Sequence, residues 1–148
     1  MISIKPLNIK TDLNALTRLH LSINGEDNDA HIESFYQNYN GDVYMFHYEN
    51  NIIGFSALSN CLWDKVSIIE EMAIDSNYQN QSFGKILLNF IIEKSKTRGD
   101  RFITVQTATW NKRAIKFYER EGFTSQTVLS KYYGDKYDLV WLDMKIKL

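Results

Sequence analysis

Residues 66–107 constrain the fold more than any other part of the sequence, because they place a helix pattern between two strand patterns. Residues 66–74 and 102–107 are rich in β-branched side chains, which is typical of strands. Residues 83–96 carry apolar side chains at positions 83, 87, 90 and 91, the spacing of one helix face, and Gly99 follows as a stop. A strand, a helix and a strand in this order are expected to form a parallel, right-handed unit.

The remainder of the chain adds strand and helix patterns on both sides of this unit. Strands are expected around Ile2 and Ile4, over residues 43–48 and 52–59 about a turn at Glu49-Asn50-Asn51, and over residues 123–132 and 137–146 about a turn at Gly134-Asp135. Helices are expected at Leu13, Leu16 and Leu19 after a cap at Thr11 or Asp12, at Ile32, Phe35, Tyr36 and Tyr39, and over residues 112–120. The order β-α-α-β-β-β-α-β-α-β-β favours a mixed α/β sheet over a doubly wound parallel one.

The composition narrows the class of protein. The 148 residues are 44% hydrophobic and 24% charged, which is typical of a soluble globular chain, and we expect a single domain over residues 1–148. The net charge of −1 gives no basic field for nucleic acid, and no apolar run approaches the roughly 20 residues that cross a membrane. The first residues lack the apolar core of a signal peptide, and the lone Cys61 and three scattered histidines form no metal pattern. We therefore expect a cytoplasmic protein without a metal and without a nucleic-acid or membrane partner.

The polar segment from Tyr78 to Lys85 lies between a predicted strand and a predicted helix. Backbone N–H groups at a helix start have no partner within the helix and lie at the positive end of its dipole, which favours a bound anion. Gly84 allows close approach to the backbone, and Lys85 adds a positive charge in the first turn. The segment by itself is equally typical of a polar turn that binds nothing.

Two motifs give the sequence a family resemblance. Gln79-x-x-Ser82-x-Gly84 resembles the Arg/Gln-x-x-Gly-x-Gly/Ala pyrophosphate loop of the GNAT superfamily of N-acetyltransferases, with Ser82 at a position where glycine is usual and Asn80 where many members have another glycine. A second block resembles the family pattern Asn-x-x-Ala-x-x-x-Tyr-x-x-x-Gly-Phe, and it consists of Asn111, Ala114, Ile115, Phe117, Tyr118, Gly122 and Phe123. The order of predicted elements also matches the family along the whole chain.

The resemblance implies a fold, a cosubstrate and a set of residues that bind it. The implied fold is a mostly antiparallel sheet, flanked by helices, that splays between two parallel strands, here 66–74 and 102–107. Acetyl-coenzyme A is expected in this opening, with its pantetheine arm along the strand and its pyrophosphate on the loop. The implied cofactor-binding residues are Met72, Ala73, Ile74, Gln79, Asn80, Gln81, Ser82, Phe83, Gly84, Lys85, Asn111, Phe117 and Tyr118.

The resemblance also implies the reaction, which is acetyl transfer to a primary amine by direct attack in a ternary complex. Tyr118 matches the family tyrosine that protonates the leaving thiolate, although a core aromatic is the plain alternative. Glu70 matches the base proposed for spermidine/spermine acetyltransferases and is expected to act through water. Strand alternation sends Glu71 to the opposite face, so either carboxylate or water alone remains a candidate. Gln106 replaces the glutamate of the ribosomal-protein branch and cannot act as a base.

The acceptor is left open among several alternatives. Residues 1–64 carry three basic and eight acidic residues, a net charge of −5, whereas residues 65–148 carry 14 basic and 10 acidic residues, a net charge of +4. This asymmetry predicts a cationic small-molecule amine, such as a polyamine or amino sugar, with Glu26, Asp27, Glu33 and Tyr132 on the acceptor side. The alternatives are a peptide or protein N-terminus and a non-catalytic acyl-coenzyme A sensor, and the family suggests a possible homodimer.

Overall fold

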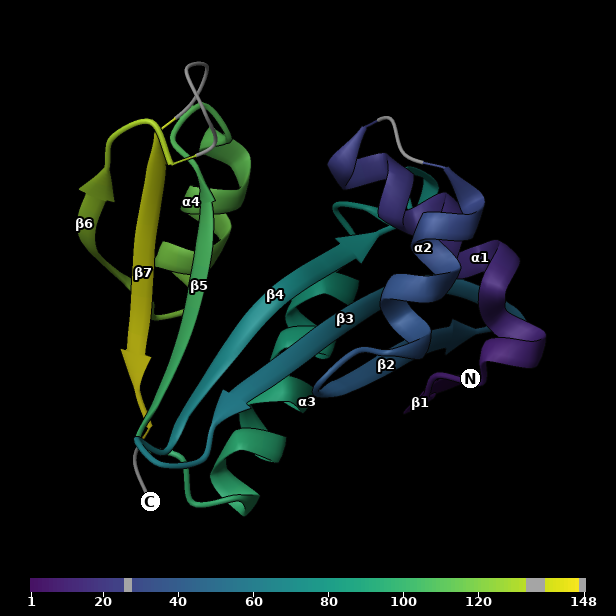
Figure 1. The fold of residues 1–148 in the computed structure, drawn as a ribbon, viewed down its shortest axis with the longest axis horizontal. Helices are drawn as coiled ribbons and strands as arrows, with labels where there is room; N and C mark the ends of the chain where they lie inside the picture. Colours follow the sequence, from purple (N-terminus) through teal and green to yellow (C-terminus); the bar gives the residue numbers. More distant parts are fainter. Residues whose placement is uncertain (26–27, 133–137, 147–148) are drawn as a thin grey trace. The chain divides into compact units, whose positions relative to one another are not determined.

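The computed structural model describes residues 1–25, 28–132 and 138–146, and these ranges contain seven strands and four α-helices (Figure 1). The elements are β1 (Ile2–Pro6), α1 (Ile9–Asn24), α2 (Asp29–Gln37), β2 (Asp42–Tyr48), β3 (Asn51–Cys61), β4 (Val66–Ile74), the short 3-10 helix η1 (Ser76–Tyr78), α3 (Phe83–Thr97), β5 (Phe102–Ala108), α4 (Lys112–Arg120), β6 (Thr124–Leu129) and β7 (Leu139–Lys145). Backbone pairing orders the strands β1-β2-β3-β4-β5-β7-β6. The expected mixed α/β architecture, with a mostly antiparallel sheet, is confirmed.

The chain divides into two compact units. The first comprises residues 1–59 and 71–91, and the second comprises residues 60–70 and 92–148. Strand β4 begins in the second unit and ends in the first, and helix α3 begins in the first unit and ends in the second. The single domain expected from the sequence stays a prediction.

Strands β4 and β5 form the expected parallel pair within the second unit. Val66–Ile69 pairs with Phe102–Val105, residue for residue. This register ends at Ile69 and Val105, whereas β4 continues to Ile74 and β5 to Ala108. In the same unit, β7 pairs antiparallel with both β5 and β6, and these three strands lie side by side (Figure 1).

The start of α1 differs from the expectation. Neither Thr11 nor Asp12 caps the helix, because the N-cap is Asn8, whose side chain accepts a hydrogen bond from the N–H of Lys10 at 3.1 Å. Asp12 lies in the first turn, where its carboxylate accepts from the N–H of Asn8 at 2.9 Å. The helix therefore begins before its apolar stripe, which the spacing of leucines could not indicate.

Turn and strand ends also differ slightly from the expectation. The β2–β3 turn has two residues, Glu49 and Asn50, both with positive φ, and Asn51 belongs to β3. Two positive φ values match the right-handed twist of a tight hairpin. Strands β6 and β7 are shorter than predicted, and the expected turn at Gly134-Asp135 lies outside the described residues.

The first unit has a core on both faces of its strands. One buried cluster joins α1 and α2 to the strands and includes Leu16, Ile32, Phe55 and Ala73. The other cluster joins Phe46 and Ile53 to Phe83 and Leu87 of α3, with Met72 and Ile74 packed against it. Ala73 thus faces one cluster while Met72 and Ile74 face the other, which is the alternation of a strand buried on both sides. This packing fixes the end of β4, from which the loop before α3 departs.

In the described ranges, no helix has the length and apolar character needed to cross a bilayer.

Candidate functional site

The loop between β4 and α3 turns through two left-handed residues, although neither is glycine. Asn80 has a φ of 63° and Ser82 a φ of 69°. Both residues are exposed, as are Gln81 and Lys85. The helix begins directly afterwards, since the N–H of Ile86 donates to the carbonyl of Ser82 at 3.1 Å. The first-turn amides, which have no acceptor within a helix, therefore lie at the end of an exposed polar loop.

Two glutamine side chains bind the backbone that precedes the loop. The Nε2 of Gln79 donates to the carbonyl of Ile74 at 2.9 Å, and the Nε2 of Gln81 reaches the carbonyl of Asn77 at 3.5 Å. The family motif implied a cofactor contact for Gln79, but its side-chain N–H group bonds to the end of β4. Its first role in the structure is to close the turn that leads into the loop.

Phe83 anchors the loop from the helix side. Its side chain is 7% exposed, and its ring contacts Tyr48, Phe46 and Tyr78 at centroid distances of 4.9, 5.7 and 6.2 Å. A side chain packed in the core cannot reach a ligand outside it. The contribution of Phe83 to an anion site is therefore limited to its backbone amide.

The first turn of α3 differs in charge from the first turns of α1 and α2, and α4 likewise has no acidic residue in its first turn. Helices α1 and α2 each have an aspartate in the first turn, Asp12 and Asp29, which complements the helix dipole. The first turn of α3 has no acidic residue and instead carries the exposed Lys85 beside the half-buried Gly84. Helix dipole, backbone amides and lysine together form a donor set that suits a pyrophosphate.

The end of β4 is held on β3 by backbone and side-chain contacts. Ser56 donates its hydroxyl proton to the carbonyl of Glu71 at 3.0 Å, and the N–H of Asp75 donates to the carbonyl of Ile53 at 2.7 Å. Between these two contacts lie Met72, Ala73 and Ile74. The resemblance assigns the pantetheine arm to these three residues, and one carbonyl in this run, that of Ile74, already accepts from Gln79.

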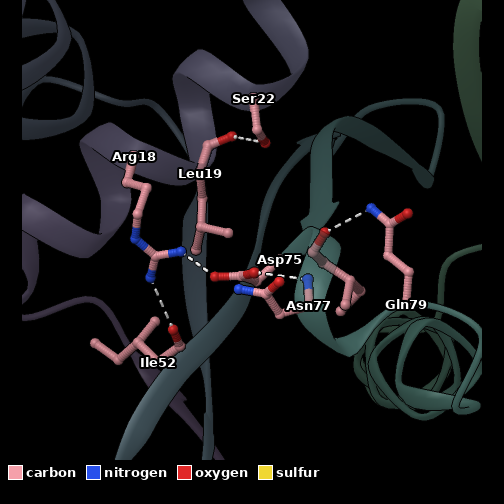
Figure 2. A network of polar contacts seen from close by, with 8 residues as sticks. Arg18, Leu19, Ser22, Ile52, Asp75, Asn77 and Gln79 are labelled. Carbon is pink, nitrogen blue, oxygen red and sulfur yellow. Dashed lines mark hydrogen bonds and ion pairs between the residues drawn. The ribbon is translucent and has the colours of Figure 1, made fainter.

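Sequence reasoning missed two residues at this place, Arg18 and Asp75. The guanidinium of Arg18 forms an ion pair with the carboxylate of Asp75, and its other nitrogen donates to the carbonyl of Ile52 at 3.1 Å (Figure 2). The segment Asp75-Ser76-Asn77 is typical of a side-chain-capped turn, which could have indicated Asp75. Nothing in the sequence indicates Arg18 as its partner, because 57 residues separate them.

In the second unit, Asn111 begins α4. Its Oδ1 accepts a hydrogen bond from the N–H of Ala114 at 3.2 Å, so Asn111 is the N-cap of this helix. Because the side-chain oxygen is used in the cap, the group that suits a further ligand is the Nδ2 amide.

Tyr118 is a buried residue on α4. It is 6% exposed, and its ring lies 5.2 Å from that of Phe117 and 5.4 Å from that of Phe123. The N–H of Phe123 also donates to the carbonyl of Tyr118 at 2.9 Å. The motif that suggested Tyr118 as an acid therefore also builds a small aromatic core, and the catalytic role stays a prediction.

Glu70 is exposed on β4, and Glu71 is half-buried. The hydroxyl of Ser67 accepts from Ser95 of α3 at 2.8 Å, so α3 covers the face of β4 on which Ser67 lies. Met72 and Ile74 pack against the cluster that includes Phe83 and Leu87 of α3, so strict alternation of faces does not run from Ser67 to Met72 and does not assign a face to Glu70.

The acceptor-side residues are only partly described. Glu33 is half-buried on α2, and Tyr132 is 58% exposed after β6. Glu26 and Asp27 lie outside the described residues. In the part of the chain that the structure describes, no group of three His, Cys, Asp or Glu side chains is placed to hold a metal ion.

Three solved acetyltransferase structures share this fold. The ribosomal-protein-S18-alanine N-acetyltransferase from Escherichia coli has a TM-score of 0.84 and 22% identity, covering 100% of this chain and 96% of that one. A GNAT family acetyltransferase from Elizabethkingia anophelis with acetyl-CoA bound has a TM-score of 0.82 and 23% identity, covering 97% of each chain. A chimera of the spermidine N-acetyltransferase SpeG from Vibrio cholerae and hSSAT has a TM-score of 0.84 and 19% identity, covering 97% of this chain and 95% of that one. At these identities the likeness establishes the fold alone.

The sequence itself gives the family. The sequence model of the Acetyltransferase (GNAT) family matches residues 13–123, and the chain belongs to this family. Among curated proteins, the [ribosomal protein bS18]-alanine N-acetyltransferase of Escherichia coli is 28% identical over 85 residues. That alignment spans 57% of this chain and 57% of the relative.

Proposed function

We propose that this protein is an acetyl-CoA-dependent N-acetyltransferase that acts on a primary amine. The observation that carries the proposal is the loop before α3, in which left-handed residues at Asn80 and Ser82 lead into a helix start that bears Lys85 and no acidic residue. This loop lies within residues 13–123, which the family model matches. Its donor set suits a pyrophosphate.

The cofactor-binding groups are assigned according to the hydrogen-bond donors and the charge that each residue presents. The pyrophosphate is assigned to the backbone amides from Gln81 to Lys85, with the Lys85 ammonium as a further charge. The pantetheine arm is assigned to the backbone of Met72 and Ala73 and to the Nδ2 of Asn111. Phe83 contributes through its amide, since its ring is buried.

The proposed chemistry requires two proton transfers. A typical alkyl amine has a pKa near the lysine value of about 10.4, so the amine must lose a proton before it can attack the thioester carbon. Glu70, exposed on β4, is proposed to accept this proton through water. As the C–N bond forms and the C–S bond breaks, Tyr118 donates a proton to the thiolate. A strand N–H at Met72 or Ala73 is proposed to stabilise the negative oxygen of the tetrahedral intermediate.

For the acceptor, we propose a cationic small-molecule amine. The support is the net charge of −5 over residues 1–64, which includes the half-buried Glu33 on α2. A field of this sign raises the local concentration of cations.

A second candidate acceptor is a protein N-terminus. The specific support is the sequence similarity over 85 residues to an enzyme named for the alanine of a ribosomal protein. The N-terminal amine of a peptide has a lower pKa, about 7.7–8.0, and so needs less help from a base than an alkyl amine does. The replacement of the ribosomal-branch glutamate by Gln106 is compatible with such an acceptor.

The experiment is a thiol-release assay with acetyl-CoA and a panel of polyamines, amino sugars and Ala-initiated peptides, paired with calorimetric titration of coenzyme A. Turnover that is highest with a polycation, and that falls with added salt, supports the first acceptor. Turnover confined to peptides supports the second. Binding of coenzyme A without turnover of any amine contradicts both and leaves a non-catalytic acyl-coenzyme A sensor.

A further inference from the structure

The Arg18–Asp75 ion pair joins helix α1 to the start of the loop that precedes α3. All the residues involved belong to the first unit. Arg18 contacts both Asp75 and the backbone carbonyl of Ile52, and Figure 2 shows its guanidinium directed at these two groups. One side chain therefore bonds to β3 and to the residue that follows β4.

Asp75 is the residue at which β4 has ended and the loop begins. Its Oδ2 receives Arg18, while its Oδ1 accepts from the N–H of Asn77 at 2.9 Å. Its backbone N–H donates to Ile53, and its carbonyl accepts from the N–H of Tyr78 at 2.8 Å. Every polar group of Asp75 is thus bonded, two of them within the turn, and Arg18 binds the same carboxylate that accepts from Asn77.

The loop beyond Asp75 needs such support. Asn80 and Ser82 adopt a backbone region that side-chain-bearing residues enter at a cost, and such residues persist only where their surroundings hold them. The helix end of the loop is anchored by the buried ring of Phe83. The strand end is anchored by Asp75 and by the hydrogen bond from Gln79 to Ile74.

We propose that Arg18 is a positioning residue that acts through Asp75 to hold the 76–82 segment in the conformation that binds the pyrophosphate of coenzyme A; this inference rests on the proposed function. The Arg18 side chain is 51% exposed. An ion pair with one partner this exposed adds little to global stability, so its effect should fall on the loop rather than on unfolding.

The test compares Arg18→Gln with Asp75→Asn, the double variant and Arg18→Lys. Lys10→Gln is the matched control, because it removes the same charge from the exposed face of the same helix. We expect Arg18→Gln to raise the Kd of coenzyme A and the KM of acetyl-CoA about three- to tenfold, with kcat within twofold at saturation. Arg18→Lys should recover part of this loss. The double variant should bind coenzyme A no more weakly than whichever single variant binds it less tightly.

Hydrogen exchange of the free protein gives a readout that does not depend on the cofactor. Amides of residues 76–82 should exchange faster in Arg18→Gln than in Lys10→Gln, while amides of α1 remain unchanged. Equal loop exchange in the two variants would overturn the inference, as would faster exchange without any change in the Kd of coenzyme A. If the unmodified protein binds no coenzyme A, the proposed function fails, and the exchange result still decides whether Arg18 positions the loop.

Discussion

Ser67 donates its hydroxyl proton to the buried carboxylate of Asp100, across 33 residues of chain in the second unit. The Ser67 oxygen in turn accepts from Ser95 and from Arg98, each at 2.8 Å. Asp100 is 3% exposed and also lies 3.4 Å from the Nε of Arg98. This network ties the start of β4 to the end of α3, the two elements that border the loop in the sequence.

Removal of the Ser67 hydroxyl should destabilise the protein. Ser67→Ala leaves the Asp100 carboxylate without one of its donors in a buried place, and an unsatisfied buried group costs about 1–3 kcal/mol. Urea denaturation should show a lower free energy of unfolding. Ser125→Ala, an exposed serine on β6, is the control and should change it by less than about 0.5 kcal/mol. Equal effects of the two substitutions would contradict the importance of the network.

A side chain at Gly54 should disturb the end of β4. A Cβ there would lie 2.7 Å from the Cδ1 of Ile74 and 2.8 Å from the carbonyl oxygen of Ala73. Gly54→Ala should therefore lower the free energy of unfolding by about 1–3 kcal/mol, as overpacking does. Gly25→Ala is an informative comparison, because Gly25 has open space around it and a φ of 68°, so its cost is conformational only. A smaller loss for Gly54→Ala than for Gly25→Ala, measured by thermal unfolding, would argue against the steric reason.

Replacement of Ser82 by glycine should strengthen cofactor binding. Ser82 has a φ of 69°, a conformation that glycine adopts without strain, and glycine is the usual family residue at this position. We expect Ser82→Gly to lower the Kd of coenzyme A by up to about fivefold, since relief of about 1 kcal/mol of strain in the bound conformation corresponds to a factor of about five. Ser82→Ala keeps the Cβ and should not improve binding. Improved binding in both variants would point to the hydroxyl rather than to the backbone.

Tyr118→Phe should reduce turnover while leaving the fold intact. Loss of a general acid typically lowers the rate by a factor of about 10² or more. The ring contacts with Phe117 and Phe123 are retained by phenylalanine, so the midpoint of thermal unfolding should stay close to that of the unmodified protein. Tyr44→Phe makes the same change at another buried tyrosine and should not affect kcat. An unchanged kcat for Tyr118→Phe would leave Tyr118 as a core residue only.

Glu70→Gln should lower the rate and move the pH–rate profile upward. Without a base, the amine must lose its proton to solvent, which becomes easier as the pH approaches the pKa of the amine, about 10.4 for an alkyl amine. Glu71→Gln tests the neighbouring carboxylate on β4. A shift in Glu71→Gln and none in Glu70→Gln would assign the base to Glu71, and no shift in either variant would leave proton transfer to water.

The sequence allowed the strand–helix–strand unit and the position of the loop to be predicted, because these depend on local patterns. The bounds of β4 agree with the predicted 66–74, and α3 begins at the predicted residue. The predicted cap of α1, at Thr11 or Asp12, was wrong, because the leucine stripe indicates the buried face of a helix and not its first residue. Asn8 caps the helix before the stripe begins.

The assignment of individual side chains depended on packing. Phe83 and Gln79 both match the loop motif, yet the ring of Phe83 is buried against Tyr48 and the Gln79 amide bonds to Ile74. A motif fixes which residue types occur at which spacing. Which of them keep a free polar group toward a ligand depends on neighbours that come from other strands.

By itself, the sequence determined the family, the order of elements and the candidate loop, because each is encoded in residues close together along the chain. Only the tertiary structure decided that Arg18 holds Asp75, and that Ser67 and Ser95 join β4 to α3. Both relationships join segments that are distant in sequence. Burial, hydrogen bonding and strand register arise when those segments pack together, and no local pattern carries them.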